Sequence, residues 1–353
     1  MQKDGDNAEE GMGVGSRSMK LARHVCRPLL DRHRFLQLAA AASLAPLLQA
    51  ASAGAAATQM LRILTIRTDA VKTVLWAQQQ NVFAGHGLAV DLQTTGSSAA
   101  SLTALIGGSA DIAAGSLFPT FAAIAHDLPV KFIAPEAFYL SDHADSLLLV
   151  KVDSPIRTAS DLNGKIIGVD SLKDVNTLAT RGWVDNGGGD GASLKAVELP
   201  PPEHLAALLG GRIDAAVFKA PYGSIAVAGG KTRLLGKPLD AIAPRFLLSA
   251  WIASDDFIKK NPQAVKAYQT VIAEAARYTN AHQDATVDLV AKFTGQEASQ
   301  VRNSSRATSA VAVTLAELQR PLDFAYKYKL IDRRLEAGDM LAPGFPIVTR
   351  DIM

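Results

Sequence analysis

The sequence has only one cysteine in 353 residues, Cys26, so it can form neither a disulfide framework nor a cysteine-ligated zinc or iron–sulfur site. It also lacks a charge excess, because 36 Lys and Arg residues stand against 34 Asp and Glu residues. Without clustered basic residues there is no positive surface for a phosphate backbone, and we expect no nucleic-acid partner. The histidines are dispersed and no G-x-S-x-G motif occurs. We therefore expect no metal, no cofactor and no catalytic residues.

Charge is also absent from one long N-terminal segment. Residues 35–61 contain no Asp, Glu, Lys or Arg, are rich in Ala and Leu, and follow a head with several basic residues. Ala51-Ser52-Ala53 and Ala55-Ala56-Ala57 resemble signal-peptidase sites. A basic head, an apolar middle and a small-residue end are typical of a secretory signal. We predict a cleaved signal within residues 1–57 and a periplasmic mature chain; an uncleaved membrane anchor is the alternative.

The export route stays open. Arg32-His33-Arg34 resembles a degenerate twin-arginine signal, in which His33 stands at the place of the second arginine. Cys26 precedes the apolar run and lacks the small neighbours of a lipoprotein site, so we expect no lipid anchor there. The rest of the chain has no cysteine, which suits an oxidising compartment.

Short apolar runs alternate with helical patterns after the signal, as in residues 61–66, 71–83 and 89–93. This alternation predicts an α/β fold with parallel strands covered by helices. One segment also occurs twice, because residues 103–114 and 206–217 share the pattern A-L-x-G-G-x-x-D-x-A. Each copy is typical of a helix, a Gly-Gly stop and a short strand opened by aspartate. The repeat therefore predicts two similar α/β lobes in tandem.

Two long apolar runs, residues 145–152 and 245–254, are expected to cross between the lobes. We thus predict a first lobe that begins at residues 58–144, a second lobe over residues 145–250, and a return to the first lobe over residues 251–353.

The returning part is helical. Asn261-Pro262 is typical of a helix start, with proline at the first helical position. A second helix is predicted over residues 284–293, stopped by Gly295. A third, over residues 315–328, contains Pro321, which predicts a kink or a restart.

Four segments resemble one known family in its own order: residues 75–90, 161–169, 210–222 and 251–280, within a match over about residues 60–330. The family is that of the periplasmic substrate-binding proteins of nitrate-, sulfonate- and taurine-type ABC importers, related to the thiamine-pyrimidine-precursor binders. The resemblance implies a two-lobed periplasmic-binding-protein fold of type II, the Venus-flytrap arrangement.

Candidate ligand-binding residues follow the strands, because ligands of open α/β sheets lie beyond the carboxyl ends of the strands. In the first lobe they offer glycine backbone, hydroxyls, a cation, a carboxylate and an aromatic ring; they are Arg67, Thr68, Asp69, Gly96, Ser97, Ser98, Gly115, Ser116 and Tyr139. Capping of the next helix by Ser97 or Ser98 explains those hydroxyls equally well. Arg67 as a merely solvated side chain and Tyr139 as hinge packing are further alternatives.

The second lobe offers fewer candidates; they are Ser171, Asn176, Thr177, Lys219, Tyr222 and, on the return, Trp251. Leu172-Lys173-Asp174 stands where many relatives carry Gly-Ser-Ser, which weakens the case for an oxyanion on this side. Surface solvation explains Lys219, and hinge packing explains Trp251, at least as well as ligand contact.

These observations predict a monomeric extracytoplasmic binding protein rather than an enzyme. By the resemblance, it captures a small organic anion or related solute by hinge closure, and its partners are that ligand and the permease and ATPase of an ABC importer. Two alternatives stay open: a thiamine-pyrimidine-related enzyme or precursor binder, and a sensory receptor.

Overall fold

Two separate β-sheets organise the residues that the computed structural model describes, which are 58–172, 174–219 and 222–349. These residues belong to a single unit, residues 56–353. The predicted signal lies outside the described residues. Within them, every helix is too short or too polar to span a bilayer.

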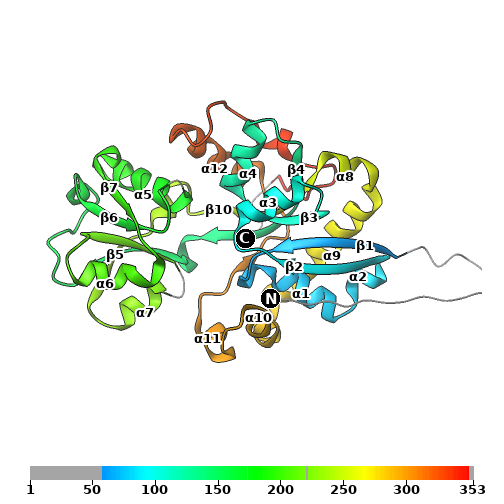
Figure 1. Cartoon of the computed structure of the whole chain (residues 1–353), viewed down its shortest axis with the longest axis horizontal. Coiled ribbons are helices and arrows are strands. Elements are labelled where there is room, and N and C mark those ends of the chain that lie inside the picture. The colour runs from blue at the N-terminus through cyan, green and yellow to red at the C-terminus, as the bar shows by residue number, and fades with distance from the viewer. Residues whose placement is uncertain (1–57, 173, 220–221, 350–353) are drawn as a thin grey trace, which may run out of the picture. The chain divides into compact units, whose positions relative to one another are not determined.

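The first sheet has six strands in the order β11-β4-β10-β3-β1-β2 (Figure 1). β1 pairs in parallel with β2 and β3, whereas β10 is antiparallel to β3 and β4. The strands are β1 (Gln59–Thr65), β2 (Leu88–Thr94), β3 (Ile112–Ser116), β4 (Val130–Leu140), β10 (Arg245–Ser254) and β11 (Thr308–Ser309). We call this sheet and the helices packed on it the first lobe.

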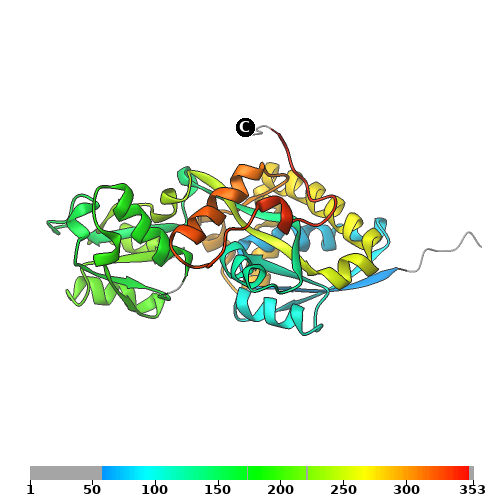
Figure 2. The same cartoon turned by 90° about the horizontal axis from the view of Figure 1, so that it is seen from above.

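The second sheet has five strands in the order β7-β6-β8-β5-β9. β6 is parallel to β7 and β8, and β5 is antiparallel to β8 and β9. The strands are β5 (Ser146–Lys151), β6 (Ile166–Val169), β7 (Lys195–Glu198), β8 (Ala215–Lys219) and β9 (Thr232–Gly236). This sheet and its helices form the second lobe, the green part of Figures 1 and 2.

The predicted repeat is confirmed, and the two copies fall in different sheets. In each copy a helix ends at a Gly-Gly pair whose second glycine has a positive φ, +76° at Gly108 and +72° at Gly211. Each aspartate then accepts a hydrogen bond from the neighbouring parallel strand, Asp111 from Arg62 N and Asp214 from Ile166 N, both at 2.8 Å. The same local chemistry therefore sets the strand pairing in both lobes.

Helices cover both faces of the first sheet. Apolar side chains of α3, α4 and α12 pack on one face, and those of α1, α2 and α9 pack on the other. The helices of this lobe are α1 (Lys72–Gln79), α2 (Val82–Gly85), α3 (Ser98–Ile106), α4 (Leu117–Ala125), α8 (Asp255–Lys260), α9 (Pro262–Ala281), α10 (Val287–Thr294), α11 (Ala298–Asn303) and α12 (Leu315–Lys327). The second sheet carries α5 (Val175–Asn186), α6 (His204–Leu209) and α7 (Tyr222–Ala228).

Three local expectations need correction. The helix predicted over residues 71–83 is interrupted at Asn81, whose φ of 57° is left-handed. Pro321 does not restart α12, which continues through it as one helix, so of the two predicted outcomes the restart is wrong and the kink stays a prediction. The two apolar runs expected to cross between lobes are instead the strands β5 and β10, and the chain passes between the sheets in the shorter segments 141–145 and 237–244.

Candidate functional site

A cavity of about 610 Å³ lies at the carboxyl ends of β1 and β3. Its walls are formed by residues 66–70 after β1, by the last residues of β3, by parts of β4 and β10, and by residues 303–308. Ser224 and Ile225 of α7, in the second lobe, also line it. The cavity thus occupies the edge of the first sheet where ligands of α/β proteins bind.

Two hydroxyls predicted from the sequence meet on one wall of the cavity. Ser98, the first residue of α3, and Ser116, the last residue of β3, place their Oγ atoms 2.9 Å apart. Gly115 lines the same wall, whereas Gly96 and Ser97 lie outside the cavity. The Ser97 side chain accepts a hydrogen bond from Ala100 N and caps α3, so its role is the alternative that the sequence analysis left open.

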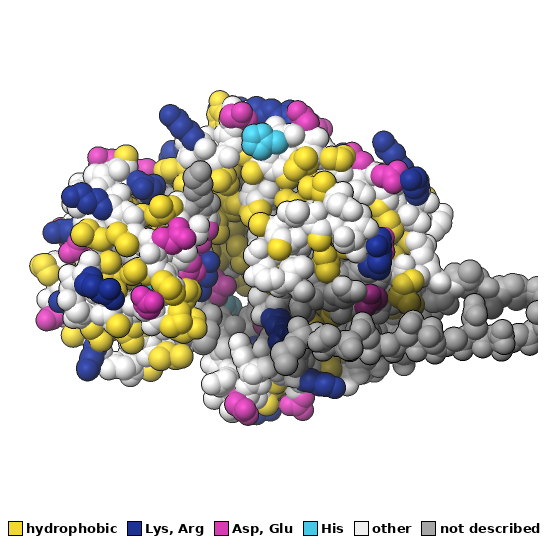
Figure 3. All heavy atoms as spheres, viewed as in Figure 1, with side chains coloured by type: hydrophobic (Ala, Val, Ile, Leu, Met, Phe, Trp, Pro, Cys, Tyr) yellow, Lys and Arg dark blue, Asp and Glu magenta, His cyan; other side chains and the backbone are white. Residues whose placement is uncertain are grey.

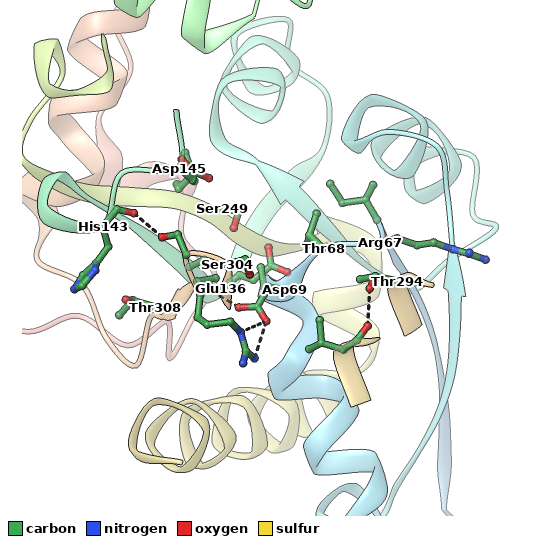
Figure 4. A pocket seen from close by; sticks show the side chains of 18 of the residues that line it. Arg67, Thr68, Asp69, Glu136, His143, Asp145, Ser249, Thr294, Ser304 and Thr308 are labelled. Carbon is green, nitrogen blue, oxygen red and sulfur yellow. Dashed lines mark hydrogen bonds and ion pairs between the residues drawn. The ribbon is translucent and has the colours of Figure 1, made fainter. Parts of the chain in front are cut away.

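The segment after β1 supplies Arg67, Thr68 and Asp69, which all line the cavity. Figure 4 shows that the Arg67 side chain extends away from Asp69 and Glu136. Arg67 is exposed and forms no hydrogen bond or ion pair with another described residue. Arg67 therefore adds a positive charge near the cavity, but its guanidinium is not held in place as a hydrogen-bond donor.

The Asp69 carboxylate is occupied by hydrogen bonds within the protein. Its carboxylate accepts from Arg306 Nε at 2.8 Å, Ala307 N at 2.7 Å and Lys72 Nζ at 3.1 Å. Lys72 is fully buried, and burial lowers its pKa although Asp69 opposes that shift. This network fastens residues 304–308 to the start of α1 and so builds a wall of the cavity.

The cavity also contains a buried carboxyl, Glu136, which is 4% exposed. The register of β4 against β10 passes from Ala137 paired with Ser249 to Pro135 paired with Ala250, so Glu136 is the extra residue of a β-bulge. Burial raises the pKa of Glu136 to about 7, and a hydrogen bond with Ser249 partly opposes the shift. Bulges of this kind redirect a side chain beside functional sites.

Tyr139 and Asp145 lie where the chain leaves the first lobe. Tyr139 lines the cavity with a side chain only 2% exposed, and its hydroxyl donates to Asp240 at 2.9 Å. Burial, together with Asp240, raises the pKa of Tyr139. Asp145 also lines the cavity, with an exposed side chain, and partial desolvation by the surrounding walls raises the pKa of its carboxyl, against the opposing effect of Lys219.

At the corresponding edge of the second sheet, Lys219 lies between two carboxylates. Its Nζ is 2.9 Å from Asp170 and 3.2 Å from Asp174. Burial acts to lower the pKa of Lys219, but Asp174 and Asp170 outweigh it and the net shift is upward. Thr177 is fully buried and donates to Ser171 O at 2.6 Å.

The remaining predicted residues are placed as follows. Ser171, Asn176, Thr177, Lys219 and Tyr222 lie at the second-lobe edge, and none of them lines the cavity. Trp251 also lies outside it, because its fully buried ring packs edge-on against Tyr268 in the core beneath the sheet. The structure therefore brings together the first-lobe candidates Arg67, Thr68, Asp69, Ser98, Gly115, Ser116 and Tyr139.

The sequence analysis missed Glu136 and residues 303–308. A signal for Glu136 exists, because a glutamate within the otherwise apolar run of residues 132–140 must be buried, and buried carboxyls need a partner. Residues 303–308 read Asn-Ser-Ser-Arg-Ala-Thr, a polar stretch far from any strand motif. Among the described residues, no group of three His, Cys, Asp or Glu side chains is placed to hold a metal ion.

Comparison with known sequences gives a family. A family model described as NMT1/THI5 like matches residues 70–286, more than half of the chain. A protein of Brucella abortus (strain 2308) named as a binding protein is 26% identical over 218 residues, which are 62% of this chain and 66% of that protein. The taurine-binding periplasmic protein of Escherichia coli (strain K12) is 28% identical over 197 residues, 54% of this chain and 58% of that one. The chain thus spans less than two thirds of the length of each of these relatives.

Solved structures share the fold. The aliphatic sulphonate binding protein SsuA of Escherichia coli superposes with a TM-score of 0.68 at 19% identity, over 84% of this chain and 96% of that one. The desulfurization enzyme DszB superposes with a TM-score of 0.59 at 17% identity, over 81% and 97%. The predicted two-lobed periplasmic-binding-protein fold is therefore confirmed, and this fold also carries an enzyme. The sequence match over residues 70–286 shows that the chain belongs to the NMT1/THI5-like family, as its resemblance to sulfonate- and taurine-type binding proteins predicted.

Proposed function

We propose that this chain is an extracytoplasmic solute-binding protein, which captures a small organic solute and delivers it to an ABC importer. The observation that carries the proposal is the cavity of about 610 Å³ at the strand ends of the first sheet. Pockets of roughly 300–1,000 Å³ are the usual size for a small organic ligand. Relatives named as binding proteins, one of them for taurine, support the same function.

In this proposal the lobes close on the ligand about the two connecting segments, 141–145 and 237–244. These segments are already linked, because the Ser141 hydroxyl donates to Asp240 at 3.0 Å, and Tyr139, at the end of β4, donates to the same carboxylate at 2.9 Å. Closure removes water from the ligand and strengthens its hydrogen bonds with the cavity. Since a charge-assisted hydrogen bond contributes about 1.5–3 kcal/mol, a few well-placed donors suffice.

The walls of the cavity fit an organic ligand with one polar end. Thr68, Ser98 and Ser116 supply hydroxyls, whereas Phe138 and Leu248 present apolar surface. A nitrate ion fills only a small part of such a volume, so organic sulfonates, taurine-like zwitterions and carboxylates fit better than inorganic anions. The proposal also includes periplasmic location after signal cleavage, a monomeric state, delivery to a permease and ATPase, and no bond chemistry.

A thermal-shift screen of the purified protein against sulfonates, amino-sulfonates, carboxylates, nitrate and pyrimidines tests this function. A ligand that binds only the folded form at one hundred times its Kd adds about 2.7 kcal/mol and must raise the melting midpoint. Native mass spectrometry of freshly purified protein gives an independent measurement, because a solute retained from the cell adds a defined mass.

A matched pair of variants locates the binding. Ser98 lines the cavity, whereas its neighbour Ala99 is exposed outside it. Ser98→Trp should fill the pocket and abolish the shift, and Ala99→Trp should retain it. Equal shifts in both variants would place the ligand elsewhere, and turnover of a bound compound would identify an enzyme instead.

A further inference from the structure

We propose, on the basis of the solute-binding function, that Glu136 determines specificity and that the ligand carries a protonated amine which pairs with its carboxylate. The predicted class thereby narrows from small anions to amine-bearing solutes, whether zwitterions or simple amines. The inference rests on the position of Glu136 in the cavity and on the absence of any cationic partner for it among the described residues.

Glu136 occupies an interior position in the cavity. Glu136 lines the cavity although only 4% of it is exposed. The Ser249 hydroxyl of β10 also lines the cavity and hydrogen-bonds the carboxyl, and Tyr268 of α9 lies near enough that the carboxylate adds to the effect of burial in raising the pKa of the Tyr268 hydroxyl. Figure 4 shows Glu136, Ser249 and Asp69 in the interior of the pocket. A ligand that enters the pocket therefore meets this carboxyl away from bulk water.

Glu136 also lacks a counter-charge among the described residues. Asp69 binds Arg306 and Lys72, the two buried cations of this wall. Arg67 extends away from Glu136 (Figure 4), and Lys219 is bound to Asp170 and Asp174. No Lys, Arg or His among the described residues forms an ion pair with Glu136. An ionised carboxylate buried without a partner is costly, and a ligand that brings a cation removes that cost.

The cavity as a whole carries no excess of cationic side chains. Its lining includes three carboxyls, Glu136, Asp69 and Asp145, and two guanidinium groups, Arg67 and Arg306, together with His143. A plain anion therefore gains no net attraction from the lining groups, because carboxyls are at least as numerous as cations. A cationic nitrogen beside Glu136 is attracted, and an acidic group on the same molecule can still reach the hydroxyl wall. On the face shown in Figure 3, charges of both signs are interspersed.

The pairing also predicts that binding of the amine releases a proton from Glu136. The Ser249 hydroxyl hydrogen-bonds Glu136, the Tyr268 hydroxyl lies within range of its charge, and burial raises the Glu136 pKa to about 7. An amine that binds only the ionised carboxylate must displace the proton. Affinity should accordingly be about tenfold weaker at pH 6 than at pH 8.

The test compares matched probes by isothermal titration calorimetry. Taurine and ethanesulfonate differ only in the amine, as do β-alanine and propionate, and ethylamine supplies the amine alone. We expect binding of one or more amine-bearing probes, at least tenfold tighter than the partner without the amine, and release of a proton measured in buffers of different ionisation enthalpy. Glu136→Gln should weaken the amine probe at least tenfold and remove the proton release, while Glu274→Gln, a substitution on the exposed face of α9, should change neither.

Two results would overturn the inference. If ethanesulfonate or propionate bound as tightly as its amine partner and Glu136→Gln bound both equally well, Glu136 would have no role in specificity, although the solute-binding function would stand. If no amine probe bound at all, the amine class would be wrong, and native mass spectrometry of the retained solute would decide the broader function separately. Circular dichroism of Glu136→Gln establishes that a lost affinity is not lost folding.

Discussion

Replacing Glu136 by glutamine should stabilise the unliganded protein at neutral and alkaline pH and change its stability little in acid. Burial raises the pKa of the native carboxyl from 4.5 to about 7. A carboxyl whose pKa is higher in the folded state binds its proton more tightly there. The wild-type protein therefore loses stability as the pH rises from 4.5 to 7, and the loss is complete above about pH 8.

The magnitude follows from the size of the shift. One pKa unit corresponds to about 1.4 kcal/mol, so a change from 4.5 to about 7 corresponds to about 3 kcal/mol of free energy of unfolding. Glutamine has nearly the same shape and never ionises, so the variant escapes this loss. Because a domain is typically stable by only 5–15 kcal/mol, the difference is large enough to measure.

The difference in stability can be measured by urea unfolding at steps of half a pH unit between pH 4 and pH 9. The quantity of interest is the free energy of unfolding of Glu136→Gln minus that of the wild type, because other titrating groups cancel in this difference. It should lie near zero at pH 4.5 and rise to about 3 kcal/mol at pH 8. The corresponding difference for Glu274→Gln, exposed on α9, should be flat. If the difference in free energy of unfolding for Glu136→Gln were also independent of pH, the conclusion that Glu136 is buried without a compensating charge would be wrong.

The other predictions concern the supporting structure. Asp69→Asn should lower the free energy of unfolding by about 3–5 kcal/mol, because it leaves the buried Arg306 and Lys72 without their carboxylate; a loss below 1 kcal/mol in urea unfolding would contradict this. Gly236→Ala should cost about 1–3 kcal/mol, because a Cβ there lies 2.3 Å from the Trp183 ring, whereas Gly338→Ala, with no atom within 4 Å, should leave the melting midpoint nearly unchanged. If the two alanine variants melted alike, the contact between β9 and Trp183 would be looser than described.

The two similar α/β lobes could be predicted from the sequence because the residues that specify the repeated helix, stop and strand are close together in the chain. The Gly-Gly stops need positive φ at Gly108 and Gly211, a conformation that glycine adopts without strain. The aspartate three residues later binds the adjacent strand in each copy. Helix and strand signals of this kind act over a few residues, so a single sequence reveals them.

Other features depend on packing between distant segments. Pro321 continues α12 because Leu318 and Leu322, on either side of it, are held in the core of the first lobe, and this packing outweighs the local cost of proline. Asp69 is a plausible ligand group by position, yet its partner Arg306 lies 237 residues later. No spacing rule connects two such residues, so the sequence could locate the loop but not the bonds that occupy its carboxylate.

Glu136 shows most clearly where counting along a strand fails. Phe132 and Phe138 pack in the core on the α4 and α12 side, and strict alternation would place Glu136 with them. Pro135 has no N–H for the ladder, and the register against β10 skips one residue at this point. The register also skips Ile133 on β4 and Leu248 on β10, so the pattern breaks on both sides of Glu136. With these irregularities the carboxyl lies beside Ser249 and near Tyr268, away from the face of Phe132 and Phe138. A buried carboxyl within an apolar strand therefore marks the place where the pattern breaks. Since Glu136 has the Ser249 hydroxyl as a partner but forms no ion pair among the described residues, its position in the cavity fits the proposed role in recognising a cationic group of the ligand.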